Sequence, residues 1–261
     1  MSAVVIDGGL IHYEAFGRGK AVVFIHGWLG SWRYWMRTME ALAPDYRTYA
    51  LDLWGFGDSD KSRDRYSVSD YTTLLYAFMD QLGIPNASLV GHSLGAIVAL
   101  RFAALQPTFI SRLAIVSLPV TSQAVNSRLL DFANNSVLAR MFWRRQITHK
   151  EVQQEVEKAA ENAIALSMQS ALEIDTSALV AQMHQPTLII YGEKDQVIDP
   201  EPVRALNEPR PNLRPIGLAE SKHFPMLEEA NKFNRLLKDF LEAGDDLSGL
   251  MLKEEWKRRT R

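Results

Sequence analysis

The sequence contains no cysteine among its 261 residues. This absence excludes disulfides, thiolate metal sites and cysteine nucleophiles, and it fits a reducing compartment, so we expect a cytoplasmic protein. No apolar run approaches the length of about 18 residues that a membrane-spanning helix needs. The first residues, MSAVVIDGGL, have neither the basic start nor the long apolar run of a secretory signal, so we expect none.

Strong net charge is also lacking. The formal net charge is −2, which gives no indication of a nucleic-acid partner. No spacing of histidines and carboxylates suggests a metal site, and the glycines at 55 and 57 lack the third glycine and the following helix of a nucleotide-binding loop. We therefore expect no metal, no cofactor and a small-molecule substrate as the partner; the oligomeric state stays open.

Apolar strands alternate with amphipathic helices along most of the chain. The expected strands, after a hairpin at Gly8–Gly9, are 21–27, the first part of 46–60, 87–93, 110–119, 186–192 and 213–219. The expected helices are 31–44, 67–83, 94–107, 200–208 and 224–244. This alternation predicts an α/β fold with a mostly parallel, doubly wound sheet.

The alternation stops between residues 120 and 182, where no strand is evident. The stretches 128–145 and 149–172 have helical patterns. We expect a helical cap, inserted after the sixth strand and lying over the carboxyl edge, where open α/β sheets bind ligands. The predicted division is a core of 1–119 and 183–243, a cap of 120–182 and a basic tail of 244–261.

The basic tail is the one segment with any indication of membrane contact. It combines leucines and a tryptophan with several lysines and arginines. An amphipathic basic helix can lie on an anionic membrane surface. We favour a surface helix or a frayed end over that interpretation.

Ser93 stands between two glycines in GHSLG (91–95), after an expected strand and before an expected helix. A serine at the tip of a tight strand-to-helix turn has strained backbone geometry, and its neighbours two residues away have no room for side chains. A serine hydroxyl is a poor nucleophile at neutral pH. It needs a histidine to take its proton and a carboxylate to orient that histidine.

Of the six histidines, only His223 follows the last expected strand. Catalytic side chains of such sheets gather at the carboxyl ends of strands, so His223 is the candidate base. His92 is next to Ser93, but adjacent side chains on the turn point apart. We interpret His92 as a packed or solvated spacer.

Asp195 is the candidate acid. It lies three residues past Gly192, at the carboxyl end of the expected strand 186–192. Glu193 and Asp199 are the alternatives in the same loop. The resulting chain order of serine, aspartate and histidine is the order that a nucleophile-elbow fold requires.

With these motifs the chain resembles the α/β-hydrolase superfamily, in its cap-covered branch of serine-nucleophile, esterase-like enzymes. The resemblance covers about residues 3–242 and rests on His26-Gly27-Trp28, DLWGFGDSD (52–60), GHSLG (91–95), GEKDQVI (192–198) and HFPMLEE (223–229). Two positions depart from the family pattern. Lys222 stands where a glycine usually precedes the histidine, and Gly27 is a single glycine, unlike the glycine-rich loop of the lipase branch.

The resemblance implies an oxyanion hole formed by the backbone N–H groups of Leu94 and Trp28, because carbonyl attack creates a negative oxygen that needs fixed donors. It also implies that His26 shapes this loop. Haloalkane dehalogenases and epoxide hydrolases share the layout but carry aspartate at the elbow, so Ser93 argues against both. The side chains expected at the substrate pocket are those of His26, Trp28, Phe142, Trp143, Val197, Ile198 and Phe224.

We therefore expect a cofactor-free serine hydrolase that cleaves a small or medium apolar acyl ester through an acyl-enzyme. The same triad also serves C–C hydrolases of ring-cleavage products, lactonases, thioesterases and cofactor-free haloperoxidases. Arginines near the elbow would favour the C–C hydrolase, but Arg144 and Arg145 are expected on a solvated face of the cap. A ligand sensor without turnover is the alternative from another class of protein.

Overall fold

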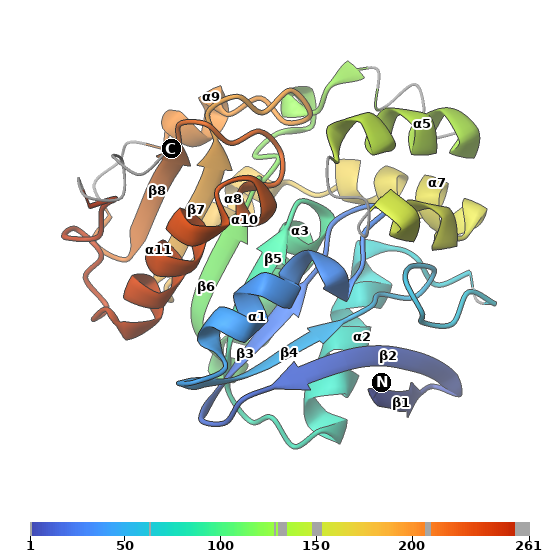
Figure 1. Cartoon of the computed structure of the whole chain (residues 1–261), viewed down its shortest axis with the longest axis horizontal. Helices are drawn as coiled ribbons and strands as arrows, with labels where there is room; N and C mark the ends of the chain where they lie inside the picture. Colours follow the sequence, from blue (N-terminus) through green and yellow to red (C-terminus); the bar gives the residue numbers. More distant parts are fainter. Residues whose placement is uncertain are drawn as a thin grey trace.

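The computed structural model describes residues 2–62, 64–127, 129, 135–147, 153–206 and 210–253. Its centre is an eight-stranded sheet in the order β1-β2-β4-β3-β5-β6-β7-β8 (Figure 1). β1 and β2 are antiparallel to their neighbours and the other strands are parallel. This confirms the predicted mostly parallel sheet. The strands are β1 Ser2–Ile6, β2 Gly9–Phe16, β3 Lys20–Ile25, β4 Tyr46–Leu51, β5 Ala87–His92, β6 Ile110–Val116, β7 Thr187–Gly192 and β8 Leu213–Leu218.

Helices cover both faces of the sheet, as a doubly wound fold requires. α1 (Met36–Leu42) and α11 (Ala230–Glu242) pack together on one face, and α2 (Val68–Gln81) and α3 (Leu94–Leu105) pack together on the other (Figure 1). The central strands β3 and β5 are buried between these layers. The other helices are α5 Ser136–Gln146, α7 Glu161–Leu172, α8 Thr176–Ala181, α9 Glu201–Arg204 and α10 Pro225–Glu228, with short 3-10 helices at η1 Trp32–Trp35, η2 Pro107–Phe109, η3 Ser122–Ala124 and η4 Gln154–Lys158.

The segment between β6 and β7 contributes α5 and α7, which lie over the carboxyl edge of the sheet (Figure 1). Apart from an isolated bridge between Val125 and Ile198, its described residues form no strand. The expected helix 128–145 falls partly outside the described residues, and α5 accounts for its second half. Within the ranges given above, no helix is both long and apolar enough to cross a membrane.

The helix expected at 149–172 is confirmed over its second half, as α7, but the stretch is not one continuous helix. Residues 148–152 lie outside the described part of the chain, and the 3-10 helix η4 is separated from α7 by two extended residues. The break occurs because Ala160 N–H donates to the carbonyl of Gly55 (2.7 Å) and the Ala159 carbonyl accepts from Arg140 (2.7 Å). Bonds to the core and to α5 have replaced helical ones.

Two other expected helices are also divided. The stretch 31–44 begins with η1, where Ser31 Oγ accepts from Arg33 N–H (3.2 Å), and continues as α1. The stretch 224–244 is split at Glu229 (φ −123°, ψ 47°) into α10 and α11. By contrast, the helix expected at 67–83 is confirmed as α2, which begins with a capping box formed by Ser67 and Asp70.

Candidate active site

Ser93 lies at the tight turn between β5 and α3, with φ 52° and ψ −112°. This is left-handed backbone that non-glycine residues rarely adopt. A methyl group on Gly91 would lie 2.3 Å from the carbonyl oxygen of Gly95, and one on Gly95 would lie 2.4 Å from that of Ile25. Both glycines are therefore required by the close approach of backbone on each side of Ser93.

His223 follows β8, and its ring is almost completely buried. Its Nδ1 lies 2.8 Å from Asp195 Oδ2. An ionised carboxylate only accepts hydrogen bonds, so Nδ1 carries the proton and donates, which leaves the lone pair of a neutral ring on Nε2. Nε2 is buried and has no hydrogen-bond partner among the described residues, and no hydrogen bond joins it to Ser93 Oγ in this structure. Such bonds are often long before substrate binds.

Asp195 lies just past the end of β7, and its side chain is 2% exposed. Its second oxygen, Oδ1, accepts from the backbone N–H groups of Val197 (2.8 Å) and Ile198 (3.0 Å). These two bonds hold the carboxylate in the orientation in which Oδ2 accepts from His223 Nδ1. They also compensate for the loss of water around the buried charge.

The two alternative acids have other partners. Glu193 forms an ion pair with Arg204. Asp199 Oδ1 accepts from the backbone N–H of Glu201 (3.0 Å) at the start of α9. Of the three carboxylates in this loop, the structure brings Asp195 to the imidazole of His223.

The loop that carries His223 is shaped by a partly buried carboxylate and a close backbone contact. Glu228 Oε2 accepts from the N–H groups of Lys222 (2.6 Å) and Phe224 (3.3 Å), and burial raises the pKa of Glu228 above its ordinary value. A methyl group on Gly192 would lie 1.9 Å from the Lys222 carbonyl oxygen. Lys222 itself is exposed and does not have a positive φ, so the glycine that is usual at this position is not required here.

Leu94 is the first residue of α3, and Trp28 follows His26-Gly27 after β3. Their backbone N–H groups have no hydrogen-bond partner in the described part of the chain. His26 Nε2 accepts from Leu53 N–H (3.0 Å), so His26 Nδ1 carries the proton and donates to the Gly27 carbonyl (2.7 Å). Burial lowers the pKa of His26, which keeps the ring neutral and the loop fixed.

A pocket between the segment 120–182 and the sheet edge reaches Ser93. Nearly all of its walls are apolar, and none of the described residues that line it carries a charge. The core contributes Trp28, Leu94 and Ile97 to these walls, and the helical segment contributes Trp143, Met168 and Leu172. The residues of α7 at this pocket were not expected, because the helical pattern of 149–172 does not reveal which of its apolar residues face inward.

The side chains expected at the pocket divide into two groups. Trp28, Trp143 and Ile198 line it. The other four are not among its lining residues. Phe224 packs edge-on against the rings of His223 (centroids 5.1 Å apart) and Trp143 (5.8 Å), Val197 is part of the core, Phe142 packs against the core, and His26 bonds to the Gly27 carbonyl.

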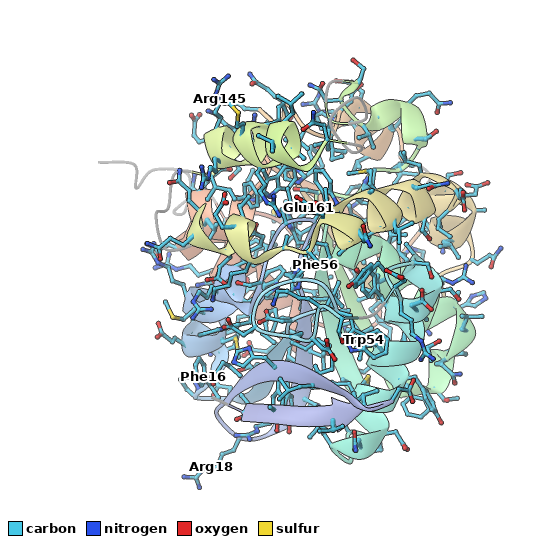
Figure 2. All side chains as sticks on the ribbon, turned by 90° about the vertical axis from the view of Figure 1, so that its right-hand side faces the viewer. Phe16, Arg18, Trp54, Phe56, Arg145 and Glu161 are labelled. Atoms are coloured by element: carbon cyan, nitrogen blue, oxygen red, sulfur yellow. The ribbon has the colours of Figure 1, made fainter. Side chains whose placement is uncertain are left out.

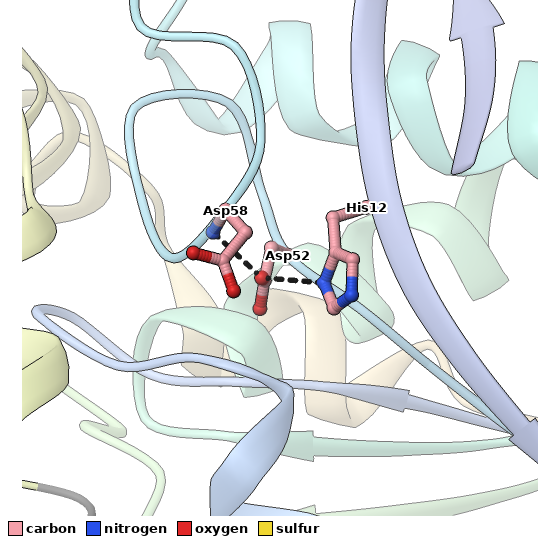
Figure 3. A group of neighbouring side chains, drawn as sticks. All are labelled: His12, Asp52 and Asp58. Atoms are coloured by element: carbon pink, nitrogen blue, oxygen red, sulfur yellow. Dashed lines mark hydrogen bonds and ion pairs between the residues drawn. The ribbon is translucent and has the colours of Figure 1, made fainter. Parts of the chain in front are cut away.

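His12, Asp52 and Asp58 form a separate cluster in which one ligand atom from each lies within 4.8 Å of the others (Figure 3). Asp52 Oδ2 already accepts from His12 Nδ1 (3.0 Å) and from Asp58 N–H (2.9 Å). The Asp58 carboxylate pairs with Lys158 (2.8 Å). Because protein donors and a cation occupy these oxygens, the donor set does not fit a metal ion, and the cluster holds the 52–60 loop to β2.

A family model described as alpha/beta hydrolase fold matches residues 20–147. Among curated proteins, the dihydrolipoyllysine-residue acetyltransferase component of the acetoin cleaving system from Pseudomonas putida is 26% identical over 256 residues, covering 90% of this chain and 68% of that protein. The pimeloyl-(acyl-carrier protein) methyl ester esterase of Vibrio campbellii is 24% identical over 257 residues, covering 88% of this chain and 98% of that protein.

Solved structures show the same fold. The enol-lactonase from Burkholderia xenovorans superimposes with a TM-score of 0.82 at 20% identity, covering 93% of this chain and 100% of that one. An identity this low establishes the fold and not the substrate.

Proposed function

We propose that this chain, which has the alpha/beta hydrolase fold, is a serine hydrolase that cleaves a small or medium, apolar acyl ester through an acyl-enzyme. Esterases are found both among its curated relatives and among its structural neighbours. The observation that carries this proposal is the buried pair of His223 and Asp195 beside the pocket that contains Ser93. Trp143 lines that pocket, and its ring centroid lies 5.3 Å from that of His223.

In the proposed mechanism Ser93 Oγ attacks the ester carbonyl and gives its proton to His223 Nε2. The bond from Nδ1–H to Asp195 holds the ring in the required tautomer and stabilises its positive charge. The N–H groups of Leu94 and Trp28 stabilise the oxyanion. The imidazolium then protonates the departing alcohol, and water, activated by the same imidazole, releases the acid from Ser93.

The charge of the pocket favours an ester over the acidic product of ring cleavage. None of the described residues that line the pocket is charged, so a carboxylate on the acyl group would meet no cation among them. Arg144 pairs with Glu157, and both side chains are about half exposed (50% and 49%). Arg145 is exposed on α5, away from the sheet (Figure 2). Neither arginine offers the counter-charge that a C–C hydrolase of that type needs.

We expect Ser93→Ala to lower turnover of p-nitrophenyl esters by about 10⁴- to 10⁶-fold while the protein folds normally, because removing the nucleophile removes the acyl-enzyme route. The measurement uses esters of graded chain length, neutral and anionic acyl groups of matched length, and a ring-cleavage diketone. Ser111→Ala, which affects a serine bonded to Ser88 at the opposite end of the sheet, is the matched control.

A fluorophosphonate probe should label the wild-type protein and the Ser111→Ala variant but not the Ser93→Ala variant, because it reacts only with an activated serine. Near-normal turnover by Ser93→Ala would refute the proposal. A wild-type protein that neither takes the label nor turns over any of the esters would point to a ligand sensor.

A further inference from the structure

His92 is the last residue of β5 and is completely buried next to Ser93. Its Nε2 lies 2.8 Å from the main-chain carbonyl oxygen of His223. A carbonyl only accepts hydrogen bonds, so Nε2 carries the proton of the neutral ring and donates it. Burial, together with the nearby ring of His223, lowers the pKa of His92 well below its ordinary value, so this donor stays neutral and in place.

Ser117 contributes a second donor to the same oxygen. It is the first residue after β6, and its Oγ donates to the His223 carbonyl at 3.1 Å. Its left-handed backbone (φ 51°) and the bond from its N–H to the Ile190 carbonyl (2.8 Å) fix its position. The ends of two neighbouring parallel strands therefore hold the backbone of His223, while the loop after β7 holds its ring through Asp195.

The other edge of the His92 ring lies against the oxyanion loop. A methyl group on Gly27 would lie 2.5 Å from His92 Nδ1, and this nitrogen is buried with no hydrogen-bond partner among the described residues. The ring centroid of His92 is also 4.8 Å from that of His223. One imidazole thus touches the backbone that precedes Trp28 and bonds to the backbone of His223.

We propose that His92 is a positioning residue, which fixes the His223 imidazole relative to Ser93 and to the oxyanion loop through its bond to the His223 carbonyl. This inference rests on the proposed function in taking His223 as the base. A displacement of about 1 Å at a reacting group can cost about 100-fold in rate. The ring of His223 is attached directly to the residue whose carbonyl His92 holds, so a shift of this backbone moves Nε2.

Two substitutions separate the hydrogen bond from the packing. His92→Phe keeps a planar ring of similar size but removes the donor, whereas His92→Gln places an amide N–H near the position of Nε2. We expect His92→Phe to lower kcat about 10- to 100-fold with KM unchanged. His92→Gln should recover most of that loss. The rate of labelling by the fluorophosphonate should follow kcat in both variants.

A double-mutant cycle with Ser117→Ala tests whether the two donors act on one group. Loss of either donor leaves the carbonyl one bond, and loss of both leaves none, so the combined effect on kcat should exceed the product of the two single effects. This variant keeps the Cβ of residue 117 and therefore its backbone strain. It also serves as an independent test if His92→Phe does not fold.

The downfield NMR signal of the His223 Nδ1–H gives a readout that does not depend on turnover. We expect a sharp signal in the wild type and in His92→Gln. In His92→Phe the signal should broaden, because the His223 ring is no longer fixed by the bond to its carbonyl. If Ser93→Ala stays active while the signal responds in this way, the proposed function fails and the positioning by His92 stands. Wild-type kcat in folded His92→Phe, or an equal loss in His92→Gln and His92→Phe, would overturn the inference.

Discussion

At the scale of single residues, Ser93 is held in its left-handed conformation because backbone packs against both of its flanking glycines. This constraint is visible in the sequence, since a serine between two glycines indicates a tight turn when a strand precedes it and a helix comes after it. The partners Asp195 and His223 can be found in the same way, because both lie at strand ends. The bond from His92 to the His223 carbonyl cannot, because backbone acceptors leave no trace in side-chain patterns.

His12 offers a test of pH dependence at this scale. Burial opposes its protonation, but the hydrogen bond and the charge of Asp52, helped by Asp58 and Glu14, outweigh this and raise the pKa of His12 above its usual value of 6.5. The folded state therefore binds the proton more tightly than the unfolded state. The resulting stabilisation is complete below pH 6.5 and is lost as the pH rises through the pKa of the folded state.

We expect the free energy of unfolding of the wild type, relative to His12→Asn, to decrease as the pH is raised from 6.5 through the folded-state pKa. The asparagine amide can still donate to Asp52 but cannot titrate. Urea unfolding at a series of pH values measures the difference. A difference that stays constant over this range would show that His12 does not carry the expected proton.

At the scale of elements, a network of four ion pairs links the 3-10 helix η4, the 52–60 loop and Arg33 of η1. Lys158 contacts Asp58 (2.8 Å) and Glu155 (3.0 Å), and Arg33 contacts Asp58 (3.4 Å) and Glu155 (3.3 Å). The side chain of Glu155 is only 3% exposed. Helical periodicity predicted one long helix here, and it failed because these contacts, with the bond from Ala160 to Gly55, join elements that are far apart in sequence.

Lys158→Met should destabilise the protein by about 2 to 4 kcal/mol, because it leaves the buried Glu155 carboxylate with Arg33 alone. Arg144→Met is the matched control. It breaks an ion pair with Glu157 in which both side chains are about half exposed (50% and 49%), and it should cost less than about 1 kcal/mol.

Chemical unfolding of both variants measures the two effects, and limited proteolysis shows whether cleavage of the Lys158→Met protein begins between residues 120 and 182. Equal losses in the two variants would contradict the importance of burial at Glu155.

At the scale of the whole molecule, the alternation of strands and helices predicted the sheet, its mostly parallel direction and the edge at which the site forms. These features depend on local periodicity and on the rule that parallel strands end at one edge. The pocket depends on how α7 and α5 pack over that edge, which is a property of tertiary contacts. Met168 and Leu172 line the pocket for this reason and were not distinguishable from ordinary core residues.

Leu172→Trp should shorten the pocket by filling part of its apolar wall. We expect kcat/KM for long acyl esters to fall about tenfold or more, since a buried methylene is worth about 0.8 kcal/mol and several would be excluded. Short acyl esters should be hydrolysed at nearly the wild-type rate. The p-nitrophenyl ester series measures this shift, and a uniform loss across all chain lengths would show that Leu172 does not limit acyl length.

The segment between β6 and β7 leaves the sheet at Ser117 and returns just before Thr187, and these two strands are direct neighbours in the sheet. Because these strands are parallel, the segment leaves the sheet at the carboxyl edge and must re-enter toward the opposite edge, and α8, which packs against α3, brings the chain back along one face of the sheet. The part before α8 is therefore an excursion that begins at the carboxyl edge. Evolution, or a designer, can replace this excursion, with α5 and α7, as a unit. The strands that position Ser93, Asp195 and His223 would stay unchanged. The substrate could then change while the chemistry stays the same.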